Sequence, residues 1–150
     1  MSTNSMNVCS QIAAVKEYFR RGDAGEFATE LFAQDFQFYF PKYGVGRGAT
    51  AFFEMAGGMR SQVVQRAAHH IDELLFIEQG NRVAVEGTTE GTDVHGVDWH
   101  GGRTRGGRFC SVFVFGQNGL IERMHVYLDP DYTGRHQDGF VWPERSTNHW

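Results

Sequence analysis

The sequence has little cysteine and no long hydrophobic run, and each shortage excludes a class of protein. Its two cysteines, Cys9 and Cys110, have the spacing of neither a disulfide framework nor a cysteine metal site, which fits a reducing compartment. No apolar stretch approaches the roughly 20 residues of a membrane-spanning helix. The first residues also lack a basic region followed by an apolar core. We therefore expect a cytoplasmic protein with no membrane partner.

Positive charge is also scarce. The chain carries 14 Lys and Arg residues against 18 Asp and Glu residues, which gives a formal net charge of -4. Nucleic-acid binding depends on concentrated positive charge, so we expect no nucleic-acid partner. The basic cluster at residues 103–108 lies between strand-like segments, and we interpret it as a solvated turn.

Phenylalanine is the residue type in excess, with 13 positions among 150. The remaining composition is that of an ordinary globular chain, and its length suits one domain whose core needs no disulfide or metal. We expect a single domain over residues 1–150, with a core at about residues 8–132 and a polar tail at residues 133–150.

Apolar residues at helical spacing predict three helices in the first half of the chain. The first covers about residues 7–21, and Gly22 and Asp23 then end this helix and cap the next one. The apolar face of a short second helix lies at residues 27–32. A third helix is expected over residues 49–59.

The rest of the sequence has the period of two that is typical of strands. Phe36, Phe38 and Phe40 place three rings on one face of a strand that Pro41 ends. Four long antiparallel strands follow, joined by glycine-containing turns, at residues 67–78, 82–92, 108–115 and 120–128. The segment at residues 109–115 has apolar residues on both faces, so we expect an α+β fold that forms a homodimer through the outer face of its sheet.

The order of these elements, with short motifs inside it, resembles the nuclear transport factor 2-like superfamily. The motifs are Arg21-Gly22-Asp23, Leu31-Phe32-Ala33-Gln34-Asp35, Gly46-Arg47-Gly48-Ala49 and Gly119-Leu120-Ile121-Glu122. The end of the last strand is similar to that of SnoaL-like members, in which an aspartate, here Asp129, commonly closes the strand. Over roughly residues 8–132, the resemblance implies a cone-shaped, curved antiparallel sheet on three N-terminal helices, with a deep pocket and a dimeric assembly.

The family's usual catalytic acids have no counterpart in this sequence. The position of the ketosteroid isomerase general base holds Phe40, that of its second acid holds Ser111, and its helix-one tyrosine falls near Val15. Epoxide hydrolases and many cyclases have an aspartate where this chain has Val126. Neither Phe nor Val can transfer a proton, so any chemistry must use other residues.

The isomerase-like register turns one apolar sheet face into the cone. Its polar exception is Ser111, which either orients a ligand oxygen or is a satisfied core residue. The tail residues Phe140 and Trp142 either cover local core or fold over the pocket mouth or the dimer partner. The expected ligand-binding residues are Tyr18, Phe36, Phe38, Phe40, Phe53, Phe109, Ser111, Phe113, Met124, Val126 and Leu128, with Phe115 on the same face.

Glu86 and His70 are the candidates for acid–base catalysis. Glu86 shares a strand face with Glu90, and the same register turns that face inward, with surface or dimer-rim placement as the alternative. His70, with Asp72, is expected to face the cone, where an imidazole can shuttle protons near neutral pH, with a purely structural histidine as the alternative.

We expect no metal and no organic cofactor. His95, Asp98 and His100 share a glycine-rich segment, but their spacing is not that of paired metal ligands, and we interpret the segment as a loop over the pocket mouth. The turn at residues 44–48 is too short for a phosphate cradle. His125 and Tyr127 alternate away from the pocket face and are assigned to the dimer sheet.

The sequence therefore predicts a cofactor-independent isomerase, cyclase, lyase or hydrolase of a small hydrophobic molecule, such as a steroid, polyketide or terpenoid. A non-catalytic small-molecule-binding protein and a dimeric interaction module with a filled cone are the alternatives. A packed interior would argue against both ligand hypotheses, whereas a buried imidazole or carboxylate with a hydrogen-bond partner would favour the enzyme.

Overall fold

The structure is a computed structural model that describes residues 10–134. Within this range two α-helices and two 3-10 turns accompany a sheet of eight strands, which confirms the α+β class. The elements are α1 (Gln11–Asp23), η1 (Thr29–Leu31), β1 (Phe32–Phe40), β2 (Gly44–Arg47), α2 (Gly48–Gln62), β3 (Val64–His69), η2 (Ile71–Glu73), β4 (Leu75–Gln79), β5 (Arg82–Asp93), β6 (Asp98–His100), β7 (Arg108–Phe115) and β8 (Ile121–Leu128).

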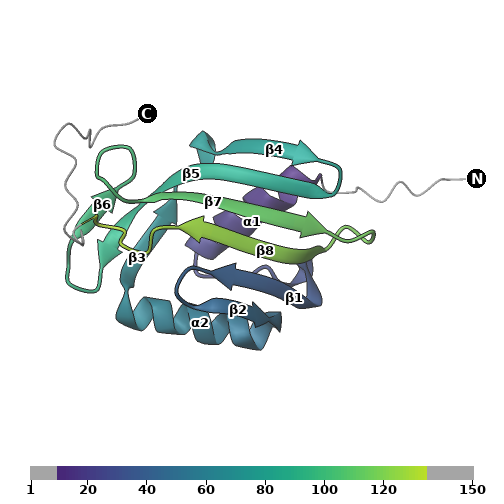
Figure 1. Ribbon diagram of the computed structural model, residues 1–150, viewed down its shortest axis with the longest axis horizontal. Helices are drawn as coiled ribbons and strands as arrows, with labels where there is room; N and C mark the ends of the chain where they lie inside the picture. Colours follow the sequence, from purple (N-terminus) through teal and green to yellow (C-terminus); the bar gives the residue numbers. More distant parts are fainter. Residues whose placement is uncertain (1–9, 135–150) are drawn as a thin grey trace, which may run out of the picture.

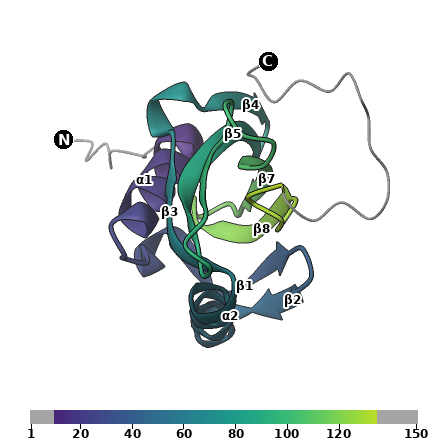
Figure 2. The same ribbon diagram turned by 90° about the vertical axis from the view of Figure 1, so that its left-hand side faces the viewer.

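The strands form a strongly curved sheet in the order β2-β1-β8-β7-β5-β3, with β4 and β6 pairing with β5 beside this path (Figure 1). The pairings are antiparallel except that of β1 with β8, which is parallel. Figure 2 shows the sheet curving from β4 round to β1, with α1 beside its concave face and α2 below β1 and β3. No helix of the described residues is long and apolar enough to span a membrane.

The first helix begins later than the sequence predicts, and the expected second helix is a short turn. The Ser10 side chain accepts a hydrogen bond from the Ala13 backbone N–H at 3.1 Å and so caps α1 at Gln11. The prediction of a second helix around residues 27–32 is wrong, because only the three-residue turn η1 forms before β1. The apolar spacing that suggested a helix is explained by ring stacking, since Phe27 packs on Phe32 at 4.9 Å between ring centroids.

The core lies between the concave sheet face and the helices. The predicted inward face is confirmed for the strand residues Phe36, Phe38, Phe109, Ser111, Phe113, Phe115, Met124 and Val126, which are buried. At one end of the core, Phe36 contacts the rings of Phe32 and Phe52 at centroid distances of 4.6 and 6.1 Å. This end of the cone is therefore filled by aromatic side chains.

A pair of phenylalanine substitutions tests this packing. Phe113 is completely buried, whereas Phe53 is 53% exposed on α2. We expect Phe113→Ala to lower the free energy of unfolding by about 3–5 kcal/mol, because it leaves a cavity in the core. Phe53→Ala should lower the free energy of unfolding by at most about 1 kcal/mol, because the side chain is exposed. Urea unfolding followed by circular dichroism measures both, and similar losses in the two variants would contradict the assigned core.

Candidate functional site

The register of β5 decides which of the predicted catalytic residues face the interior. Val83 and Val85 of this strand are fully buried opposite the inward face of β7. Glu86 follows Val85, pairs with Cys110 and is exposed. The expectation that Glu86 points into the cone is therefore wrong, because the two valines occupy the inward positions of the strand.

The adjacent histidines at the end of β3 lie on opposite faces of the sheet. His69 faces α1 and the core, where its ring contacts Phe19 at 4.5 Å and Phe109 at 5.1 Å between centroids. His70 instead places Nδ1 2.7 Å from Thr88 Oγ1, on the face that Glu86 shares. The inward placement of His70 with Asp72 is therefore wrong, because β3 ends with His69 directed inward and the chain then turns into η2.

Asp23, at the end of α1, holds His69 through two hydrogen bonds. Its carboxylate accepts from the His69 backbone N–H at 2.8 Å and contacts ring Nδ1 at 2.7 Å. A carboxylate only accepts, so Nδ1 carries the proton and Nε2 of the neutral ring carries the lone pair. The arrangement can act as a base oriented by an aspartate, and both side chains are less than one-third exposed.

Tyr18 is a partly buried phenol that packs on a ring neighbouring this pair. Its ring packs against Phe19 at 5.1 Å and against Phe113 at 5.8 Å, so it shares Phe19 as a neighbour with His69. Burial, and secondarily the negative charge of Asp23, raise the pKa of Tyr18 above its ordinary value. The hydroxyl therefore stays protonated at neutral pH and can donate a hydrogen bond.

The other expected ligand residues divide between the core and the surface. Ser111 is 1% exposed and lies between Val85 and Val126 across the sheet, so its role as a ligand contact stays a prediction. Phe40 and Leu128 are partly buried against the core. The prediction that Phe53 lines the interior is wrong, because its position on α2 leaves about half of the residue exposed.

A second aromatic contact joins the glycine-rich segment to the chain after β8. Trp99 of β6 is buried, donates a hydrogen bond to Thr89 Oγ1 at 3.0 Å and packs on Tyr132 at 4.9 Å. The Tyr132 hydroxyl reaches Met59 Sδ of α2 at 3.9 Å, and burial raises its pKa to about 12. Residues 129–134 are thereby attached to both β6 and α2. The expected positions of Phe140, Trp142 and Cys9 lie outside the described residues.

The outer sheet face carries polar and aromatic groups. His125 Nε2 lies 2.9 Å from Gln37 Oε1, and burial together with Arg123 lowers the pKa of this histidine. Tyr127 is 51% exposed and contacts Tyr39 at 5.8 Å between ring centroids. The predicted outward direction of His125 and Tyr127 is confirmed, because Met124 and Val126 alternate with them and are buried.

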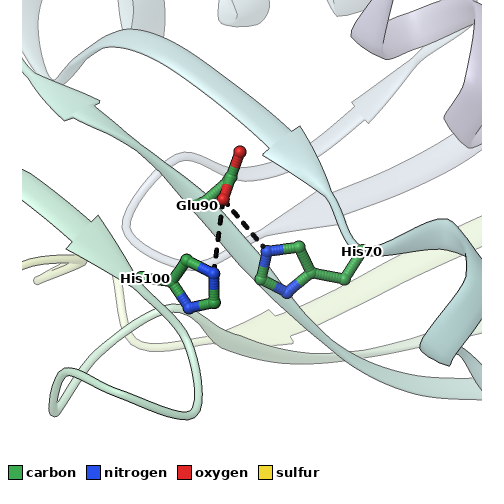
Figure 3. Close-up of side chains that lie close together, drawn as sticks. All are labelled: His70, Glu90 and His100. Atoms are coloured by element: carbon green, nitrogen blue, oxygen red, sulfur yellow. Dashed lines mark hydrogen bonds and ion pairs between the residues drawn. The ribbon is translucent and has the colours of Figure 1, made fainter.

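Three residues from separate segments converge on the side of β5 that Glu86 faces. Figure 3 shows His70 and His100 directed toward the carboxylate of Glu90. His95 and Asp98, which the sequence grouped with His100, do not join them: His95 is exposed in the turn, and Asp98 accepts a hydrogen bond from Thr92 Oγ1 at 2.6 Å.

Comparisons with known proteins agree with this architecture. The sequence model of the SnoaL-like domain matches residues 12–124, whereas no curated protein sequence matches the chain. A proposed polyketide cyclase from Pseudomonas putida has 16% identity and a TM-score of 0.66, over 82% of this chain and 94% of that chain. The protein TerC, crystallised with polyporic acid, has 21% identity and a TM-score of 0.65, over 79% and 91% of the two chains. The epoxide hydrolase/cyclase-like enzyme SalBIII, described in pyran ring formation in the polyether salinomycin, has 21% identity and a TM-score of 0.58, over 79% and 90%.

The hydrogen bonds of His69 predict its tautomer. At a pH where the ring is neutral, ¹⁵N NMR of the imidazole should find the proton on Nδ1, because the Asp23 carboxylate accepts it. Asp23→Ala removes this acceptor and should shift the population toward the Nε2–H form. A wild-type ring protonated on Nε2, or one indifferent to Asp23→Ala, would contradict the geometry.

Proposed function

The chain belongs to the SnoaL-like domain family, within the superfamily that its sequence motifs indicated, and we propose that it is a cofactor-independent isomerase or cyclase of a small, largely apolar molecule. The observation that carries the proposal is the Asp23–His69 pair, which places an oriented base against the rings of Phe19 and Phe109. A base beside apolar walls suits proton transfer at carbon, because water competes less for it there.

In the proposed reaction, His69 and Tyr18 have complementary roles. His69 Nε2 takes a proton from a carbon next to a carbonyl group, and the resulting imidazolium is stabilised by Asp23 through Nδ1. Tyr18 donates a hydrogen bond to the oxygen on which negative charge develops. Return of the proton to another carbon gives an isomer. Alternatively, the enolate carbon attacks a second carbonyl carbon of the same molecule and closes a ring; the π bond of that carbonyl breaks, and the His69 imidazolium returns its proton to the alkoxide oxygen that results.

The solved relatives support the class of reaction. One is described as a proposed polyketide cyclase and another as an epoxide hydrolase/cyclase-like enzyme, and a third was crystallised with the small molecule polyporic acid. Their chains differ from this one at about four-fifths of the aligned positions or more, so they support a class of chemistry and not a substrate.

Proton exchange tests the proposal without knowledge of the substrate. Apolar cyclic ketones incubated with the protein in D₂O should incorporate deuterium at the carbon beside the carbonyl group. NMR measures the rate of this incorporation. We expect His69→Gln to lower the exchange rate at least about 100-fold, because the base is removed. His95→Gln, in an exposed turn, is the matched control and should leave the rate unchanged. Equal rates for His69→Gln and the wild type would refute the assignment of the base.

The filled end of the cone favours a second candidate, a dimeric interaction module. Phe36 and Phe113 are almost fully buried by other side chains, as expected when an interior is used for stability. The outer sheet face offers exposed aromatic surface at Tyr127 with Tyr39 beside it, which suits a symmetric contact between two copies.

Sedimentation velocity tests the dimer proposed for this face. The wild type should sediment as a dimer, and Tyr127→Lys should shift it to a monomer, because it puts a positive charge on the proposed contact face of each copy. Phe53→Lys, on exposed α2, is the control and should remain dimeric. A monomeric wild type, or dissociation by Phe53→Lys alone, would contradict this face. An interaction module further predicts no ketone exchange in the dimeric protein.

A further inference from the structure

We propose that His70, Glu90 and His100 form a binding site for a divalent transition-metal ion of the zinc class, on the sheet face opposite His69. The three residues come from the turn after β3, from β5 and from β6 (Figure 3). Glu90 and His100 are direct partners in the β5–β6 ladder. The site does not involve Asp23 or His69, so it stands apart from the proposed proton transfer.

Hydrogen bonds to the two imidazole rings orient their free nitrogens. His100 Nδ1 lies 3.1 Å from the Gly101 carbonyl oxygen, which only accepts, so this nitrogen carries the proton. His70 Nδ1 lies 2.7 Å from the hydroxyl of Thr88, a buried residue. Metal-binding histidines are held in this way, with one ring nitrogen on a protein oxygen and the other directed at the ion.

The free nitrogens then meet a carboxylate oxygen. The Nε2 atoms of His70 and His100 each lie 3.4 Å from the same oxygen, Oε2 of Glu90. In the neutral His100 ring this nitrogen carries a lone pair, and two electron-rich atoms that face each other are held together by a shared proton or by a cation. Of the two, a metal ion is the one that can bond all three residues at once.

The distances suit coordination better than hydrogen bonding. A separation of 3.4 Å is long for a hydrogen bond, which is ordinarily about 2.7–3.2 Å between an N–H donor and an oxygen. Two ligand atoms bound about 2.1 Å from a tetrahedral zinc ion are about 3.4 Å apart. The three donor atoms all lie within 4.8 Å of one another, so small side-chain rotations bring them to one ion.

The ligand set leaves room for a further ligand. Two histidines and a glutamate make three protein ligands, the number found at zinc sites that keep a position for water or substrate. The side chains are 17%, 41% and 35% exposed for His70, Glu90 and His100, so solvent reaches the site. A surface hollow of about 240 Å³ lies next to the site, because Thr88 and Gly101, which contact the two imidazole rings, also line this hollow.

Zinc titration of the untagged full chain tests the site. After dialysis against a chelator, calorimetry should give one Zn²⁺ per chain for the wild type. We expect Glu90→Gln and His100→Ala each to weaken binding at least about tenfold, since each removes a ligand. His95→Ala removes a nearby histidine outside the site and should bind as the wild type does.

Two further measurements keep the outcome decisive if a variant folds poorly. Co²⁺ added to the wild type should give the intense visible absorption of a tetrahedral site, and Zn²⁺ should bleach it. Zn²⁺ should also raise the melting temperature of the wild type and not that of Glu90→Gln. The proposal would be overturned if the wild type did not bind Zn²⁺ stoichiometrically, or if Glu90→Gln and His100→Ala both bound Zn²⁺ as tightly as the wild type.

Discussion

Burial of Val83 and Val85 against β7 fixes the register of β5, and both candidate sites depend on that register. Because side chains alternate along a strand, a shift of one residue would exchange the two faces along its whole length. β5 also pairs with β3, β4 and β6, so it carries the register to His69 at the end of β3 and to His70, which follows it. The inner face consequently receives one histidine with Asp23, and the outer face receives the other with Glu90.

The sequence predicts the aromatic faces well because their alternation is unambiguous. Residues 109–115 place phenylalanine at three of four alternate positions, with Ser111 at the fourth, and this pattern alone gives the inward direction of β7. In residues 82–92 the valines and glycines share one phase, and Arg82, Glu86 and Glu90 share the other. This alternation itself favours the valines as the inward residues, and the inward direction expected for Glu86 came from the register of the resembling family instead. The absent second helix has a different cause: rings spaced for a helix stack equally well between a turn and a strand.

The polar clusters are harder to predict because they join distant segments. Asp23 and His69 are 46 residues apart, and only the closure of α1 against the end of β3 brings them together. The sequence does offer two signals for this pair, an aspartate at a helix end and a histidine pair of which one member must face inward. It offers none for the cluster of His70, Glu90 and His100, because the spacing within the glycine-rich segment points to His95 and Asp98, which lie elsewhere.

The central claim is that two consecutive histidines serve two different sites, and NMR of the imidazole nitrogens during a zinc titration tests it most directly. With one equivalent of Zn²⁺, the account predicts that the Nε2 resonances of His70 and His100 shift strongly while those of His69 stay in place, held by Asp23. A zinc-dependent shift of His69 equal to that of His70, or no response from either His70 or His100, would contradict it.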